Sequence, residues 1–477
     1  MKIEKSKNRI DLFTHLLKKS GLSKFYEAND LVIQKLAISI DYICFLQGVD
    51  ENEKFESKMH FKRFIFIKSV FKYILLPIWT FTKLRDTQIK GSVYKYVVIR
   101  STHRIDLLNG ISKYLEEDET LNLFLINSQL KEFLRIHNNT RVHKNRFIPR
   151  PILSLEVIYN QFLIRKKVEN FLQDLYSQDT KYYNIRTSVM ELLSSFVYHR
   201  VNAERIYRRM KRNINSRTLF FFENDMSGSH LALANLLNKF GHKTIHVQHG
   251  FLENPYYYRP ITRYMFYSAK KDEVLLQSIG VNDIKLLQFG LPFQARLNDV
   301  VINTEFENDF LVLAGKSSIL TQRQYLSVLS ILETSIPKKN IMLRLHPHFS
   351  DYEKKYWKDK SSNWRSSVAQ ESLLKSIEGS QVVITFSYDA AIFALQLGKQ
   401  IILFIDSSSI LFRYKQKLTT AGIYVFWDKE TLKQCVNSDL NQNIIMEDLC
   451  HFFGEFDVDV QAQLFQHNLQ EINKAYS

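Results

Sequence analysis

Short apolar runs that alternate with amphipathic helical segments constrain the fold of this chain more than any other feature. In the unit at 218–250, TLFFFEN is typical of a strand, SGSHLALANLLNKFG of a helix closed by Gly241, and KTIHVQHG of a second strand. The alternation begins near residue 93 and resumes from 309 to 405, after a polar stretch at 298–309. Strands that alternate with helices predict parallel sheets covered by helices on both faces.

The length of the chain extends this prediction to two domains. A chain of 477 residues is too long for one ordinary hydrophobic core. We therefore predict an α/β protein in which two Rossmann-like domains, residues 91–297 and 298–455, face each other across a cleft. Residues 1–90 are predicted to form a helical, basic and aromatic N-terminal segment, and residues 456–477 a C-terminal helix.

The charge balance predicts an anionic partner. The formal net charge is +16, which suits nucleic acid, an anionic membrane face or a phosphorylated substrate. The three cysteines show no metal-ligand spacing and are typical of free thiols in a reducing compartment. Neither a signal peptide nor an apolar run of the ~20 residues that span a bilayer is visible, so we expect a cytoplasmic location.

The segment at 60–85, HFKRFIFIKSVFKYILLPIWTFTKLR, mixes aromatic residues with Lys and Arg and contains no acid. Such a segment can lie in a membrane interface with its cations toward lipid phosphates. It can equally be a buried helix whose lysines extend to solvent. The first reading predicts peripheral association with the inner face of the cytoplasmic membrane.

Polar residues follow three predicted strands of the second domain. Arg344 and His346 end one strand, Ser387 ends another just before a helix, and Lys316 and Ser317 follow the first strand of the domain. Ligands of open α/β sheets bind at the carboxyl ends of strands. A helix N-terminus there offers unpaired N–H groups to a phosphate, and a cation and a hydroxyl would complete the site. Any one of these residues could instead be a cap or a turn residue; their coincidence predicts a phosphate site.

One polar turn ends a strand of the first domain. In Gln248-His249-Gly250, the glycine permits a tight turn or a close approach of the backbone. His249 could contact substrate or the facing domain, or it could be structural. We therefore include Gln248, His249 and Gly250 as candidates for contact with substrate or the cleft.

Three motifs occur in a fixed order: HVQHG at 246–250, LRLHP at 343–347, and VVITFSYDAAIFALQLGKQIILF at 382–404. Together they resemble the GT-B glycosyltransferases that build bacterial capsules and lipopolysaccharides, a group that includes sialyltransferases and Kdo transferases using CMP-sugars. The resemblance covers roughly 218–405. It implies the GT-B fold and a sugar transfer from a nucleotide-sugar, with a CMP-sugar favoured and a UDP-sugar as the alternative, to a glycan or glycolipid acceptor.

The resemblance also implies roles for two residues. His346 would contact the donor phosphates and stabilise the leaving phosphate, and Ser387 would bind the same phosphates. The chain departs from the family at Tyr388, where relatives often have a second hydroxyl residue, and at Phe393, where many have Glu. Recognition of the ribose and base is therefore open.

Transfer also requires a base for the acceptor hydroxyl and stabilisation of the leaving group. The base should come from the first domain, and the candidates are Glu223, Asp225 and His103, although Asp225 could equally cap the following helix. No Asp-x-Asp motif lies at a convincing strand end. We therefore predict a metal-independent enzyme with no cofactor.

Two other functions compete with sugar transfer. CDP-glycerol-type phosphotransferases of teichoic-acid and capsule synthesis also have a His-Gly turn, an Arg-x-His-Pro motif and a Ser-bearing helix start. Theirs is usually Trp-His-Gly with an Asp-Tyr-Ser-Ser loop, so Gln248 and Tyr388 favour the glycosyltransferase. A nucleic-acid-binding protein would suit the charge, but no recognisable module supports it, and we expect no nucleic-acid partner.

Overall fold

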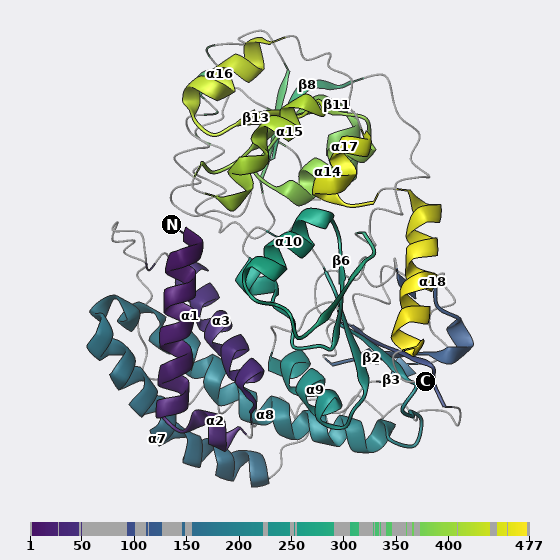
Figure 1. Cartoon of the computed structure of the whole chain (residues 1–477). Helices are drawn as coiled ribbons and strands as arrows, with labels where there is room; N and C mark the ends of the chain where they lie inside the picture. The colour runs from purple at the N-terminus through teal and green to yellow at the C-terminus, as the bar shows by residue number, and fades with distance from the viewer. Residues whose placement is uncertain are drawn as a thin grey trace.

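The structure is a computed structural model of the whole chain. It describes residues 2–26, 28–46, 49, 93–100, 111–112, 114–125, 146–147, 155–222, 228–248, 252, 255–290, 306–313, 328, 330–332, 334, 340–345, 359, 365–366, 373–407, 409–438, 446–455 and 457–474. Two separate parallel sheets form the framework of this described part, each at the centre of one half of the molecule (Figure 1). The α/β fold class predicted from the alternation of strands and helices is confirmed.

The sheet of the first half has the strand order β3-β2-β1-β4-β5-β6-β7 among the described residues. The central strands consist almost entirely of buried apolar side chains, as expected for a parallel sheet covered on both faces. Its strands are β1 Tyr96–Arg100, β2 Thr120–Phe124, β3 Arg146–Phe147, β4 Leu219–Phe222, β5 Lys243–Val247, β6 Tyr264–Tyr267 and β7 Lys285–Gln288.

The sheet of the second half has the order β10-β9-β8-β11-β12-β13 in the described part of the chain. Its strands are β8 Asn308–Leu313, β9 Ile341–Arg344, β10 Arg365–Ser366, β11 Ser380–Thr385, β12 Gln400–Phe404 and β13 Tyr424–Phe426. Each sheet grows outward in both directions from its first strand, so the connections reverse between β1 and β4 and between β8 and β11. Ligands of doubly wound sheets bind at the carboxyl ends of the strands at such reversals.

Helices near the N-terminus belong to the core of the first half. Apolar residues of these helices pack with Val97, Leu121 and Phe220 on one face of the first sheet. The N-terminal helical segment predicted from the sequence is therefore present and integral to this half. The helices on this face are α1 Lys2–Lys19, α2 Leu22–Phe25, α3 Asp30–Leu46, α7 Leu155–Gln178, α8 Arg186–Met210 and α9 Gly228–Lys239, with the 3-10 turns η2 Thr180–Ile185 and η3 Pro255–Tyr258.

Helices of the second half cover both faces of its sheet. One face packs against α14 and α17, and the other against α16. The elements are α13 Leu373–Glu378, α14 Tyr388–Gln396, η5 Ile410–Tyr414, α15 Lys415–Thr420, α16 Lys429–Asn437 and α17 Met446–Phe453. The first half reaches this layer through α10 Lys270–Ser278, whose Leu275 and Leu276 share an apolar cluster with Phe452 and Phe453 of α17.

The C-terminal helix α18 Val458–Lys474 returns to the first half. Phe465, Leu469 and Ile472 pack with Val98 and Phe221 on the face of the first sheet opposite α8 and α9. Figure 1 shows α18 running alongside the first half, far from α16. The chain therefore crosses between the halves twice, once after β7 and once after α17.

The described helices include none that is long and apolar enough to cross a bilayer. The basic and aromatic segment at 60–85 lies outside the described residues, as does the greater part of 101–110 and 126–154.

Candidate active site

Three adjacent strands of the second sheet end in one row. Leu313 at the end of β8 is in register with Arg344 of β9 on one side and with Thr385 of β11 on the other. Since neighbouring strands lie about 4.8 Å apart, Arg344 and Thr385 are separated by about 10 Å across this edge. A cationic side chain and the start of α14 therefore flank the carboxyl end of β8, beside the reversal of the sheet.

The guanidinium of Arg344 is hydrogen-bonded to a helix of the second half. Its Nη1 donates to the Ser376 hydroxyl at 2.8 Å, and Ser376 is buried on α13. Arg344 is only partly buried, so its guanidinium lies at the boundary between the sheet and solvent. An arginine whose guanidinium is fixed in this way has a defined orientation, and the planar guanidinium matches the geometry of phosphate.

Ser387 begins α14 without using its hydroxyl to cap it. The residue has extended backbone angles (φ −119°, ψ 124°) and makes no side-chain capping bond. Thr385 stabilises the turn instead, because its hydroxyl accepts from the Ser387 N–H at 3.0 Å and donates to the Ser387 carbonyl at 3.1 Å. By contrast, Asp428 caps α16 with its side chain. The Ser387 hydroxyl therefore does not cap helix α14.

Most of the other predicted site residues cannot be placed. The structure does describe the strands that precede the three candidate bases, since His103 follows β1 and both Glu223 and Asp225 follow β4 in the sequence. These two strands are adjacent and parallel and end on the two sides of the reversal of the first sheet. The predicted residues that lie outside the described part of the chain are His103, Glu223, Asp225, His249, Gly250, Lys316, Ser317 and His346.

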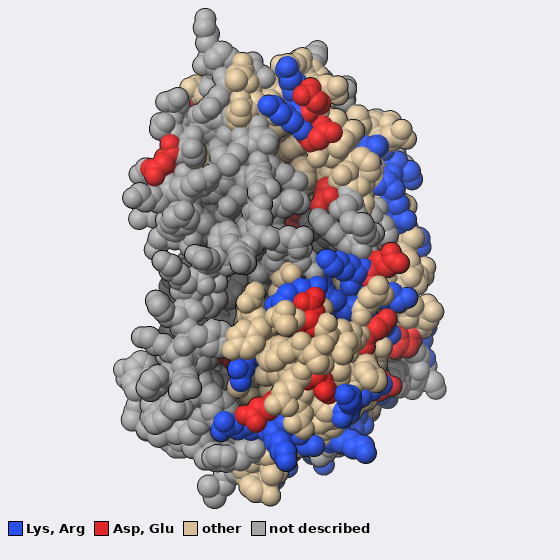
Figure 2. Space-filling model, turned by 90° about the vertical axis from the view of Figure 1, so that its left-hand side faces the viewer, with Lys and Arg blue, Asp and Glu red and all other residues tan. Residues whose placement is uncertain are grey.

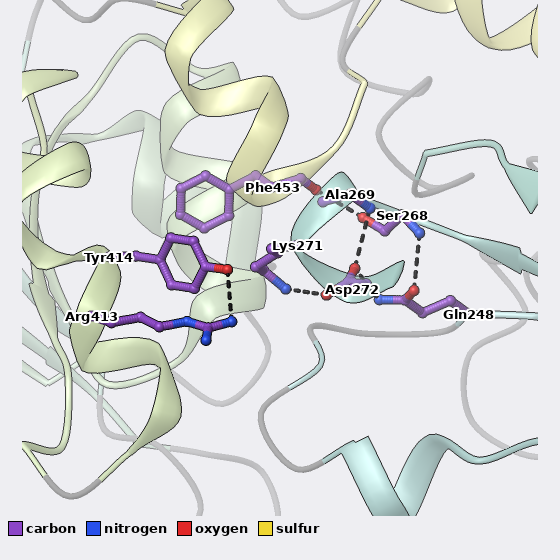
Figure 3. Close-up of polar contacts among 8 residues, drawn as sticks. All are labelled: Gln248, Ser268, Ala269, Lys271, Asp272, Arg413, Tyr414 and Phe453. Atoms are coloured by element: carbon purple, nitrogen blue, oxygen red, sulfur yellow. Dashed lines mark hydrogen bonds and ion pairs between the residues drawn. The ribbon is translucent and has the colours of Figure 1, made fainter. Parts of the chain in front are cut away.

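Gln248 lies in the interior and not on a substrate-facing surface as we expected. Its Nε2 donates to Asp272 Oδ2 at 2.9 Å, and its Oε1 accepts from the Ser268 N–H at 2.9 Å (Figure 3). The side chain is completely buried. A buried amide must satisfy both its donor and its acceptor, and here protein groups do so. Gln248 thus fixes the end of β5, one residue before the predicted His249 turn.

His199 is a buried histidine of the first half that no sequence pattern singled out as a candidate. It lies on α8, and a Cβ added to Gly228 at the start of α9 would be 2.4 Å from its Cδ2. Burial lowers the pKa of His199 to about 4, so the imidazole is neutral at neutral pH. Its buried Nδ1 makes no hydrogen bond within the described structure. Only the tertiary contact between 199 and 228 brings this ring to the carboxyl end of β4, and no local sequence pattern signals it.

Among the described residues, no group of three or more His, Cys, Asp and Glu side chains is arranged to hold a metal ion. Cys44, Cys435 and Cys450 are free thiols.

Comparison with known proteins supports the fold. No family model matches the chain, and no curated protein matches it in sequence. Among solved structures, a Listeria monocytogenes protein assigned as a UDP-N-acetylglucosamine 2-epimerase is similar with a TM-score of 0.52 and 10% identity, over 81% of this chain and 98% of that one. A co-structure of S. aureus MnaA with UDP has a TM-score of 0.51 and 12% identity, over 80% and 97%.

A third solved structure is similar to this chain to about the same extent. The UDP-N-acetylglucosamine 2-epimerase of Rickettsia bellii has a TM-score of 0.50 and 11% identity, over 81% of this chain and 97% of its own. Likenesses at this level of identity establish the fold alone. The chain therefore has the GT-B type of architecture, in which two parallel α/β domains are joined and the N-terminal half carries additional helices.

Proposed function

We propose that this protein is a glycosyltransferase that moves a sugar from a nucleotide-sugar to a bacterial surface glycan such as capsule or lipopolysaccharide. A CMP-sugar is the favoured donor and a UDP-sugar the alternative. The observation that carries the proposal is the row at the edge of the second sheet, where Arg344 and the start of α14 flank the end of β8. This arrangement combines a cation with the N-terminal end of a helix, where the helix dipole is positive, and both suit a phosphate group of such a donor.

The proposed roles of the site residues depend on which group gains negative charge during sugar transfer. As the bond between sugar and phosphate breaks, negative charge accumulates on the leaving phosphate, and Arg344, His346 and the N–H groups of α14 would stabilise it. The Ser387 hydroxyl would donate to the same phosphate, and Lys316 and Ser317 would lie on its other side. Such stabilisation requires no metal ion. The acceptor hydroxyl would lose its proton to Glu223, Asp225 or His103 from the first half.

A second candidate is epimerisation of a UDP-sugar. The structures with the higher TM-scores include UDP-N-acetylglucosamine 2-epimerases, and one of them contains UDP. The phosphate site described above would serve either reaction, since the donor of the transfer and the substrate of the epimerase both carry phosphate between nucleoside and sugar. CDP-glycerol-type phosphotransfer is a third reading, in which phosphate enters the product.

One set of assays separates these candidates. We expect CMP to raise the melting temperature of the protein more than UDP, CDP or GDP. Incubation with the matching donor should then yield a glycosidic product without phosphate in the new linkage. Conversion of UDP-N-acetylglucosamine to its 2-epimer in the absence of acceptor would establish the epimerase instead, and phosphate in the linkage would establish the phosphotransferase.

We also propose peripheral association with an anionic membrane surface. Exposed cations near the end of α8 support it, namely Arg208, Arg209, Lys211 and Arg212. On the face shown in Figure 2, coloured Lys and Arg side chains are interspersed with Asp and Glu, so the positive charge of the described residues is not gathered there in one patch. We expect neutralisation of the cations in 60–85 to reduce flotation with anionic vesicles. A gel-shift on generic DNA and RNA should show no complex.

A further inference from the structure

The return of the chain from the second half to the first is unusually tight. Gly454, which follows α17, has φ +103°, and a Cβ added there would lie 2.6 Å from the Ser268 hydroxyl and 2.8 Å from the Ser268 carbonyl. The other connection passes close by, because a Cβ on Gly290 would lie 3.2 Å from the Glu455 carbonyl. Glycine is required at both points, by the positive φ and by the close approach. The two crossings therefore meet beside the turn between β6 and α10.

A network of buried polar groups surrounds Ser268, where the two connections between the halves lie close together. The Ser268 hydroxyl donates to the Phe453 carbonyl of α17 at 2.8 Å, while the Ser268 N–H donates to Gln248 at 2.9 Å. Asp272 accepts from Gln248 at 2.9 Å and from the Ala269 N–H at 3.2 Å. One end of β5 and the start of α10 are thus connected through side chains of the first half, and Ser268 extends the network to the backbone carbonyl of Phe453 in the second half (Figure 3).

Two opposite charges lie inside this network. Lys271 and Asp272 form an ion pair, and their side chains are 0% and 1% exposed. The Lys271 ammonium also lies 5.4 Å from the centroid of the Phe452 ring, on the other half. Figure 3 shows Tyr414 of η5 next to Lys271, on the side away from Gln248. A buried ion pair adds little net stability compared with apolar packing, and its best-attested use is to specify one arrangement of the parts that it joins.

We propose that Asp272 is a positioning residue that sets the end of β5 relative to the second half. Its carboxylate holds Gln248, the residue before His249, and its partner Lys271 packs on α17. The end of β5, at the carboxyl edge of the first sheet, is thereby tied to the second half. The proposal rests on the proposed function only for the identity of the ligand, a nucleotide.

The test uses the full-length protein with a paired substitution, Lys271→Met with Asp272→Asn, which removes both buried charges together. The matched control is Lys270→Met with Glu273→Gln, the ion pair on the same turn of α10 in which Lys270 is exposed and Glu273 is partly buried. Spin labels are placed at Lys239→Cys on α9 and Lys433→Cys on α16, both exposed, in a background with Cys435→Ser and Cys450→Ser. Distances between the labels are measured by pulsed electron resonance, without ligand and with CMP or UDP.

We expect the buried-pair variant to broaden the distance distribution without ligand and to lower kcat at least tenfold, while the Kd for the nucleotide changes less than twofold. The control variant should match the wild type in all three. A distance distribution identical to that of the wild type would overturn the proposal. An unchanged kcat despite a broadened distribution would show that the position of β5 relative to the second half does not affect the reaction.

Two further results keep these outcomes distinct. If the wild type binds no nucleotide, the proposed function fails, whereas a broadened distribution in the variant still supports the positioning role. If the buried-pair variant does not fold, Ser268→Ala takes its place, because it removes only the bond to Phe453. That variant should also broaden the distribution, and a wild-type distribution in it would contradict the proposal.

Discussion

Arg344 and Thr385 lie on opposite sides of the same residue, Leu313, in the register of the second sheet. They are 41 positions apart in the sequence, from 344 to 385. The register brings the arginine and the turn at Ser387 to one edge because parallel strands end together. The proposed phosphate site depends on this register, and so do the expected effects of substitutions at Arg344 and Ser387.

Replacement of Arg344 by Ala should weaken nucleotide binding about 10- to 100-fold, since a hydrogen bond to a charged group contributes about 1.5–3 kcal/mol. Arg344→Lys should recover only part of the affinity, because the ammonium cannot form the paired contacts of a guanidinium. Isothermal titration calorimetry measures both. Lys433→Ala, an exposed cation on α16, is the control, and equal losses in the Lys433 and Arg344 variants would argue against a phosphate site at this edge.

Ser387→Ala should reduce nucleotide affinity by about threefold to tenfold, as expected for one hydrogen bond worth about 0.5–1.5 kcal/mol. It should leave the free energy of unfolding nearly unchanged, because the hydroxyl does not cap α14. Asp428→Ala should show the reverse pattern. The Asp428 carboxylate accepts from the Thr431 N–H at 2.8 Å, so its loss should cost about 1 kcal/mol of stability without affecting the nucleotide. A stability loss in Ser387→Ala equal to that of Asp428→Ala would contradict this assignment.

Stability should fall as the pH is lowered from about 6.5 toward 4, in part through His199. Burial lowers the pKa of His199 to about 4 in the folded protein, whereas the unfolded residue titrates near 6.5. The unfolded state therefore binds more protons in this window, and protonation favours unfolding. The contribution of His199 approaches about 3 kcal/mol at the lower end.

Urea unfolding of the wild type and of His199→Gln across pH 4–7 tests this. The variant should show a shallower dependence on pH, because its amide does not titrate. Burial also lowers the pKa of His242 and His451, so some dependence should remain. Parallel curves for the two proteins would show that folding does not lower the pKa of His199.

Arg9→Met should destabilise the protein by about 3–5 kcal/mol at pH 7, because it leaves a buried carboxylate without its cation. Asp41 is fully buried and accepts from Arg9 Nε at 2.5 Å and from the Tyr257 hydroxyl at 3.1 Å. Burial raises the pKa of the Asp41 carboxyl, with Arg9 opposing it, so the defect should shrink as the pH falls and Asp41 becomes neutral.

Chemical denaturation at pH 7 and pH 4 checks this expectation. Arg165→Met is the control, since Arg165 pairs with Glu169 on the exposed surface of α7 and should cost less than about 0.5 kcal/mol. Similar losses in the two variants would mean that the buried Asp41 carboxylate does not depend on Arg9 as its cation.

The sequence by itself determined the elements and the class of the fold. Apolar runs such as TLFFFEN and QVVITFS predicted strands that the structure contains as β4 and β11, because a strand covered on both faces must be apolar throughout. Gly241 was predicted to close a helix, and it follows α9 with φ +79°. The sequence also predicted that Arg344 and Ser387 lie near strand ends, since this depends only on where each local pattern stops.

The tertiary structure decided which of these ends meet and which polar groups are buried. Register placed Arg344 and Thr385 beside Leu313, and packing placed His199 against Gly228. Gln248 was expected at a substrate surface, but a partner 24 positions away, Asp272, keeps it in the interior. The path of α18 onto the first sheet was equally invisible in the sequence. Such contacts join residues far apart in the chain, and no local periodicity records them, because a side chain's burial depends on what the completed fold packs against it.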